Sequence, residues 1–112
     1  MAQAAISDII NNDQPTPVTI EKIIEEVART FGVTPEDIRS ENRRAQISNA
    51  RQVAIYAVRE ITQIPYKAIG KEFGNRDHST IVYALQQMDK KIAKDSKTKA
   101  TVEDIIKNIR NL

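Results

Sequence analysis

A carboxylate, an imidazole and two hydroxyls stand at four consecutive positions, Asp77, His78, Ser79 and Thr80. Such groups can carry acid–base or nucleophilic chemistry, or they can exchange hydrogen bonds with a partner surface. A nucleophile pair does not fit, because neighbouring residues on a helix point about 100° apart and the chain has 1 His. With 0 Cys, thiolate chemistry and cysteine-ligated metals are excluded. We therefore expect a hydrogen-bonding group, with no enzymatic activity, metal or other cofactor.

These four residues follow a short amphipathic segment and a turn. The pattern over residues 65–73 predicts a helix of about two turns that Gly74 and Asn75 end, and a second amphipathic helix begins at Asp77. Two helices joined by about three residues that include glycine are typical of a helix-turn-helix. In that motif the start of the second helix enters the major groove of DNA, where its side chains reach the base edges.

The other elements are predicted to be helical too. Apolar residues recur at spacings of three and four, without strict alternation, which indicates an all-α fold, a small helical bundle. We expect N-caps at Thr19, Thr34 and Ser48. The further helices are expected from Ile20 to Phe31, from Pro35 to about Glu41, from Ser48 to Ile61 and, after a polar break at 94–96, around Val102 to Ile109.

The first seventeen residues are predicted to be an appendage. A short connector helix is expected around residues 6–10, and the polar stretch that follows contains Pro15 and Pro17, which indicates a linker. We therefore divide the chain into a connector, 1–17, and one helix-turn-helix domain, 18–112. The chain of 112 residues has the size of a single domain.

Charge is unevenly distributed along the chain. Residues 1–42 carry 3 Lys/Arg against 8 Asp/Glu, whereas residues 43–92 carry 9 against 4. The charges are either an ordinary solvated surface or a face for a polyanion. The density between 43 and 76 favours phosphate binding, with seven cations and two acids. The cations are Arg43, Arg44, Arg51, Arg59, Lys67, Lys71 and Arg76.

Two interpretations stay open at the start of the second helix. Asp77 can cap the helix alone, or it can cap the helix and, if it also faces the groove, accept a hydrogen bond from cytosine N4. His78 can be an ordinary solvated side chain or a base contact. The methyl group of Thr80, or the Cβ of Ser79, can contact a thymine methyl.

The segment from Arg51 to Leu85 closely resembles the signature of the C-terminal domain of the DnaA family of bacterial replication initiators. The resemblance is carried by the Pro-Tyr-Lys-Ala-Ile-Gly run at 65–70 and by the block from Phe73 to Thr80, and it extends more weakly from Val18 to Leu112. It implies a Trp-repressor-like helix-turn-helix that binds short, asymmetric duplex elements, the DnaA boxes, as a monomer. It also implies a cytoplasmic, nucleoid-associated protein.

The resemblance assigns roles to individual residues. Arg43 falls on the family's minor-groove arginine, and Asp77, His78 and Ser79 fall on its base-reading positions. Contacts to the DNA backbone are implied for Arg44, Arg51, Gln52, Arg59, Thr62, Lys67, Arg76 and Thr80.

Three departures from the family pattern affect these expectations. Asn75 replaces a usual glycine, and asparagine is among the best non-glycine residues at positive φ. Lys67 stands where a proline that touches a thymine methyl is common, so a phosphate contact is expected instead. The loop at 45–49 holds no cation.

The chain has no Gly-x-x-x-x-Gly-Lys-Ser/Thr phosphate-binding loop. ATP and Mg²⁺ are therefore expected only for the AAA+ module of a longer initiator, and that module is also expected to contact further protomers. We interpret the chain as part of such an initiator. The alternatives are a stand-alone regulator that binds the same boxes, and a helical adaptor whose basic face binds an acidic protein.

Overall fold

The computed structural model of the chain describes residues 16–111, so the connector helix predicted around residues 6–10 lies outside the described part. Within that part the fold is all-α, as predicted. The helices are α2 (Thr16–Phe31), α3 (Pro35–Arg39), α4 (Ala45–Thr62), α5 (Tyr66–Glu72), α6 (His78–Lys94) and α7 (Ser96–Arg110). Among residues 16–111 no helix combines the length and apolarity that crossing a bilayer requires.

The predicted signals between α2 and α3 are confirmed. Gly32 ends α2 with a φ of 70°, in the region that favours glycine. The Thr34 hydroxyl accepts a hydrogen bond from the Asp37 N–H at 3.0 Å, and the Thr34 N–H donates to the Asp37 carboxylate at 3.3 Å. This reciprocal capping box satisfies two N–H groups that a helix start otherwise leaves unpaired.

Two predicted helix starts are wrong. The first helix of the described part, α2, begins at Thr16, so Thr19 is not its N-cap and Pro17 belongs to the helix, where a proline in the first turn is tolerated. The long helix begins at Ala45, and Ser48 already donates its N–H to the Arg44 carbonyl at 2.8 Å. A tertiary contact accompanies this early start. The Gln46 side-chain amide donates a hydrogen bond to the Phe31 carbonyl at 2.6 Å.

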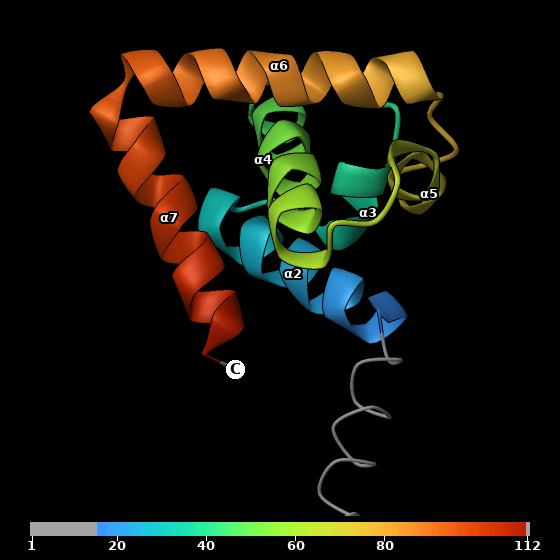
Figure 1. The fold of residues 1–112 in the computed structure, drawn as a ribbon, viewed down its shortest axis with the longest axis horizontal. Coiled ribbons are helices and arrows are strands. Elements are labelled where there is room, and N and C mark those ends of the chain that lie inside the picture. Colours follow the sequence, from blue (N-terminus) through green and yellow to red (C-terminus); the bar gives the residue numbers. More distant parts are fainter. Residues whose placement is uncertain (1–15, 112) are drawn as a thin grey trace, which may run out of the picture.

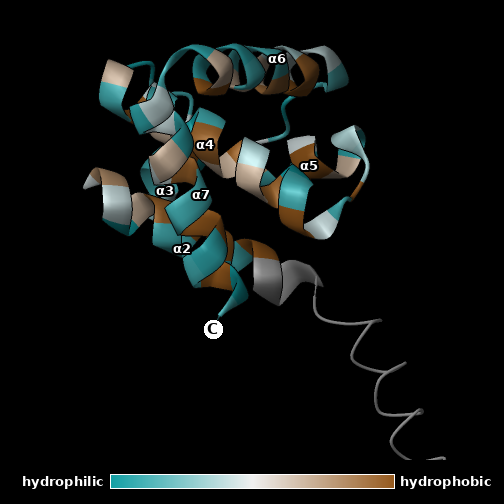
Figure 2. Cartoon of the chain, turned by 60° about the vertical axis from the view of Figure 1, so that its left-hand side comes forward, coloured by the Kyte–Doolittle hydropathy of each residue, from teal (hydrophilic) through white to brown (hydrophobic). Residues whose placement is uncertain are grey.

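The central element is α4, as predicted, and it packs against each of the other helices. In Figure 1 it stands in the middle, with α6 running across the top, α7 descending on the left and α5 on the right. The apolar faces of the helices turn towards this centre (Figure 2). The predicted stripes of α2 and α4 lie in the core except for Phe31 and Ile61, which are partly buried against it. The core also contains Ile38, Ile69, Phe73, Ile81, Met88, Val102, Ile105 and Ile109.

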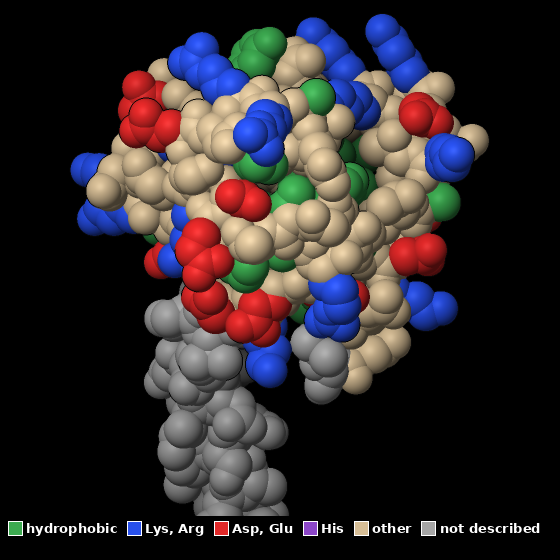
Figure 3. Space-filling model, turned by 180° about the vertical axis from the view of Figure 1, so that it is seen from behind, with side chains coloured by type: hydrophobic (Ala, Val, Ile, Leu, Met, Phe, Trp, Pro, Cys, Tyr) green, Lys and Arg blue, Asp and Glu red, His purple; other side chains and the backbone are tan. Residues whose placement is uncertain are grey.

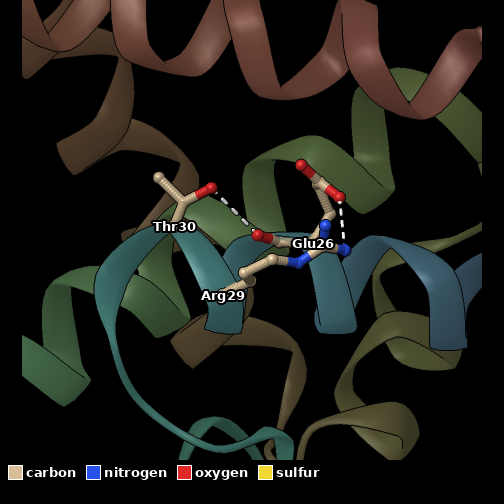
Figure 4. A network of polar contacts seen from close by, with 3 residues as sticks. All are labelled: Glu26, Arg29 and Thr30. Carbon is tan, nitrogen blue, oxygen red and sulfur yellow. Dashed lines mark hydrogen bonds and ion pairs between the residues drawn. The ribbon is translucent and has the colours of Figure 1, made fainter.

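The outward face of α2 carries local polar contacts. Arg29 donates to the Glu26 carboxylate at 2.8 Å, and the Thr30 hydroxyl donates to the Glu26 carbonyl at 3.0 Å (Figure 4). Seen from behind, several acidic side chains lie close together in the lower left part of the described molecule (Figure 3).

Candidate nucleic-acid interface

The turn between α5 and α6 is held by backbone geometry. Gly74 and Asn75 have φ values of 80° and 59°, so both adopt the left-handed conformation that the sequence predicted for this turn. The Arg76 N–H donates to the Gly70 carbonyl at 3.0 Å. A Cβ atom on Gly70 would lie 2.1 Å from the Arg76 carbonyl oxygen, so only glycine allows α5 to approach the turn this closely.

The start of α6 is capped by Asp77. Its Oδ1 accepts hydrogen bonds from the Thr80 N–H at 3.0 Å, the Thr80 hydroxyl at 2.8 Å and the Ser79 hydroxyl at 3.2 Å. These bonds, first of all the one from the Thr80 N–H, lower the pKa of Asp77 below its usual value, because they stabilise the carboxylate. The capping interpretation of Asp77 is therefore confirmed.

All four residues from Asp77 to Thr80 are exposed, and the first buried residue of α6 is Ile81. The predicted polar start of the second helix is therefore free to meet a partner.

The imidazole of His78 lies against an aromatic ring. The centroids of the His78 and Tyr66 rings are 5.3 Å apart and their planes are inclined by 62°, an edge-to-face arrangement. The guanidinium carbon of Arg59 lies 4.6 Å from the centroid of the same tyrosine ring. Sequence reasoning missed Tyr66, since nothing in the helical pattern indicates that the first residue of α5 meets the first residue of α6.

Arg43 lies on the same side as the turn. It lines a pocket of about 230 Å³ with Gly74, Asn75 and Arg76, and Glu41 and Arg51 complete the lining. Arg43 and Arg44 are both exposed. The Arg44 N–H donates to the Asn42 side-chain oxygen at 2.9 Å, which orders this loop. The structure thus brings the predicted minor-groove arginine next to the helix-turn-helix.

Arg51 departs from its predicted placement. It is only 7% exposed, and it donates from Nε to the Ile38 carbonyl at 2.7 Å and from Nη2 to the Asp37 carbonyl at 3.0 Å. Burial, followed by the nearby charge of Arg76, lowers its pKa. The expectation that Arg51 is a surface cation is therefore wrong, because its guanidinium binds the C-terminal carbonyls of α3. Its contact with phosphate stays a prediction.

The remaining predicted backbone contacts are partly or fully exposed. Gln52 accepts a hydrogen bond from Lys91 at 2.8 Å, and the Thr62 hydroxyl donates to the Val58 carbonyl at 2.7 Å. Arg59 donates to the Ile64 carbonyl at 2.7 Å. Lys67 is exposed. These residues lie at different points along α4 and at the start of α5, so they do not form one compact cluster.

A polar network behind the turn was also missed. Arg76 donates from Nη2 to the Ser40 carbonyl, and Arg39 pairs with Glu21 at 2.8 Å and with Glu72 at 4.0 Å. These contacts tie α2, the loop after α3 and α5 together. No local pattern predicts them, because the partners are distant in the sequence.

A family model described as the bacterial dnaA protein helix-turn-helix matches residues 20–88. The chain belongs to this family. The match to the DnaA helix-turn-helix covers most of α2 and continues into α6, and it includes every predicted contact residue from Arg43 to Thr80.

Full-length relatives agree with this membership. The chain is 39% identical over 109 residues to the chromosomal replication initiator protein DnaA of Citrifermentans bemidjiense, which is 97% of this chain and 24% of the relative. It is 38% identical over 109 residues to DnaA of Lachnoclostridium phytofermentans, again 97% of this chain and 24% of the relative. The chain therefore spans about a quarter of the length of these DnaA proteins.

A solved structure supports the same fold. The crystal structure of a DNA replication initiation factor superposes with a TM-score of 0.77 at 26% identity, over 84% of this chain and 29% of that one. The all-α helix-turn-helix predicted from the sequence is thereby confirmed.

Proposed function

We propose that this chain binds duplex DNA sequence-specifically, as the DnaA-box-reading part of a chromosomal replication initiator. The observation that carries the proposal is the exposed polar start of α6, which lies beside a basic loop on the same side of the molecule. Membership of the DnaA helix-turn-helix family supports it. One copy is expected to bind one asymmetric element.

In this proposal the start of α6 enters the major groove, where His78 and Ser79 meet base edges. Asp77 orders that turn as its cap, since one of its oxygens already accepts three hydrogen bonds. Its second oxygen is the group that would accept from a cytosine amine. The exposed Arg43 reaches into the adjacent minor groove.

The phosphates on both sides of the groove are contacted by side chains that carry no sequence information. We assign this role to the cations Arg44, Arg59, Lys67 and Arg76, and to the polar groups of Gln52, Thr62 and Thr80. Arg51 is left out of this set because its guanidinium is engaged with α3.

The test begins by selecting bound duplexes from a random pool with the wild-type chain. Arg43→Ala and His78→Ala are each expected to weaken binding to the selected duplex by about 1–3 kcal/mol while binding to a scrambled duplex changes little. Arg29→Ala is the matched control, because Arg29 lies on the outer face of α2, paired with Glu26. Titration by fluorescence anisotropy measures each Kd.

Equal losses on both duplexes would assign Arg43 and His78 to phosphate contact and contradict base reading by these residues. The absence of any duplex binding at low salt would overturn the proposal as a whole. Binding of an acidic protein in place of DNA would then favour the adaptor interpretation of the basic face.

A further inference from the structure

We propose that Tyr66 is a positioning residue that holds the imidazole of His78 in the orientation in which it meets the major groove. The proposal rests on the proposed base-reading role of His78. It assigns a function to a contact between α5 and α6 that the helix-turn-helix fold itself does not require.

Three helices meet at this contact. Arg59 lies in the last turn of α4, Tyr66 is the first residue of α5 and His78 is the first residue of α6. The Arg59 guanidinium carbon is 4.6 Å from the Tyr66 ring centroid, and that centroid is 5.3 Å from the His78 ring. The tyrosine ring therefore touches both a cation assigned to phosphate and an imidazole assigned to a base.

The ring is itself held in place. Tyr66 is half-buried and packs against the core, and Arg59 also donates to the Ile64 carbonyl at 2.7 Å, which fixes the loop just before α5. By contrast, His78 is exposed. Among the described residues, the ring of Tyr66 is the group that restrains the His78 imidazole.

An exposed side chain that must adopt one orientation on binding loses rotational freedom, and that loss reduces affinity. An edge-to-face contact favours one arrangement of two rings before the partner arrives, and a cation over the tyrosine face adds a second attraction. Pre-ordering of His78 by Tyr66 reduces this loss only where His78 reads a base. The contact should therefore affect specific binding more than non-specific binding.

The first measurement compares Tyr66→Leu with Tyr66→Phe. Leucine fills apolar space at the core without a ring, whereas phenylalanine keeps the ring. On the selected duplex Tyr66→Leu is expected to lose roughly three- to tenfold in affinity, with little change on a scrambled duplex, and Tyr66→Phe is expected to stay near wild type. Tyr83→Leu is the control. Tyr83 is an exposed aromatic residue of α6, and because it comes five residues after His78 it lies on a different side of the helix.

The second measurement is a double-mutant cycle with His78→Ala. If Tyr66 acts through His78, Tyr66→Leu adds no further loss of affinity in the His78→Ala background. Additive losses would overturn the proposal, and so would an equal loss on selected and scrambled duplexes.

A third measurement needs no DNA. NMR of the free chain should show cross-relaxation between the Tyr66 ring and the His78 imidazole, and His78 ring-proton shifts that move in Tyr66→Leu and persist in Tyr66→Phe. This measurement separates the two proposals. If the wild-type chain binds no duplex selectively, the proposed function is contradicted. If the wild-type chain shows no cross-relaxation between the two rings, the positioning role is overturned, even if Tyr66→Leu does not fold.

Discussion

At the scale of single residues, the contacts of Arg51 show that it has a structural role in the fold. Its guanidinium is buried between α4 and the end of α3, where it donates to two backbone carbonyls. The last carbonyls of a helix have no intrahelical partner, so a buried donor there stabilises the fold. An arginine on an exposed face would be available to contact a phosphate instead.

Arg51→Met tests this distinction. Methionine keeps much of the apolar stem but leaves the Ile38 carbonyl without the Arg51 donor, which costs about 1–3 kcal/mol in the free energy of unfolding. The Asp37 carbonyl keeps its hydrogen bonds from the Ser40 N–H and hydroxyl. Urea denaturation should show the loss, whereas Arg44→Met, at an exposed position, should stay within about 0.5 kcal/mol of wild type. Unchanged stability with a large loss of DNA affinity would return Arg51 to the phosphate contacts.

The sequence could not predict this burial. Apolar spacing from Ala50 to Ile61 indicates a stripe on one side of the helix, and Arg51 lies beside that stripe. In the fold α4 has neighbours on several sides, so its buried surface is wider than one stripe and includes Ile47, Arg51 and Ile55. The exposure of Asp77 to Thr80, on a helix with a narrower buried face, was predicted correctly.

At the scale of elements, the helix boundaries that local chemistry decides were predictable, and those that tertiary contacts decide were not. Thr34 and Asp77 cap their helices as expected, because each side chain bonds its own first turn. The start of α4 at Ala45 has no side-chain cap. Instead, the Gln46 side chain is hydrogen-bonded to the end of α2, and no local sequence pattern predicts this contact.

The joint between α6 and α7 gives a pH-dependent prediction. The Asp95 carboxylate accepts hydrogen bonds from the Thr98 hydroxyl at 2.8 Å and the Lys97 N–H at 3.0 Å. These bonds, the one from Thr98 first, lower the pKa of Asp95. Because the pKa is lower in the folded than in the unfolded chain, the stabilisation is complete above about pH 4 and is lost as the pH falls through the lowered value.

Asp95→Asn isolates this effect, since asparagine caps a helix about as well but does not titrate. Thermal midpoints of wild type and variant should differ most near neutral pH, with wild type more stable, and should converge below about pH 4. A difference that stays constant from pH 7 to pH 3 would show that the charge of Asp95 does not contribute to the cap.

At the scale of the whole molecule, the fold brings together Arg43 and Arg76, which lie more than thirty positions apart in the sequence. Arg43 and Arg44 precede α4, Arg59 ends it, and Lys67 and Arg76 belong to α5 and the turn after it. The charge imbalance along the chain predicted a basic region. Only the packing of the loop before α4 against the turn before α6, where Arg43 and Arg76 share a pocket, places this charge beside the exposed polar residues of α6.

This arrangement determines how binding should respond to salt. If the four cations assigned to phosphate, Arg44, Arg59, Lys67 and Arg76, each neutralise one phosphate, the logarithm of the association constant should fall against the logarithm of salt concentration with a slope of about −3.6. A fifth contact from Arg51 would bring the slope to about −4.5. Titrations of the selected duplex between about 50 and 300 mM salt would measure it, and a slope near zero would contradict a phosphate-binding face.

Single substitutions assign the slope to particular residues. Lys67→Ala should make the slope shallower by about 0.9 and weaken binding to selected and scrambled duplexes alike, because a phosphate contact carries no sequence information. Lys99→Ala, which removes an exposed charge of α7, should leave the slope unchanged. If Lys67→Ala instead weakens only the selected duplex, this lysine reads a base in place of the proline that is common at its position in the family.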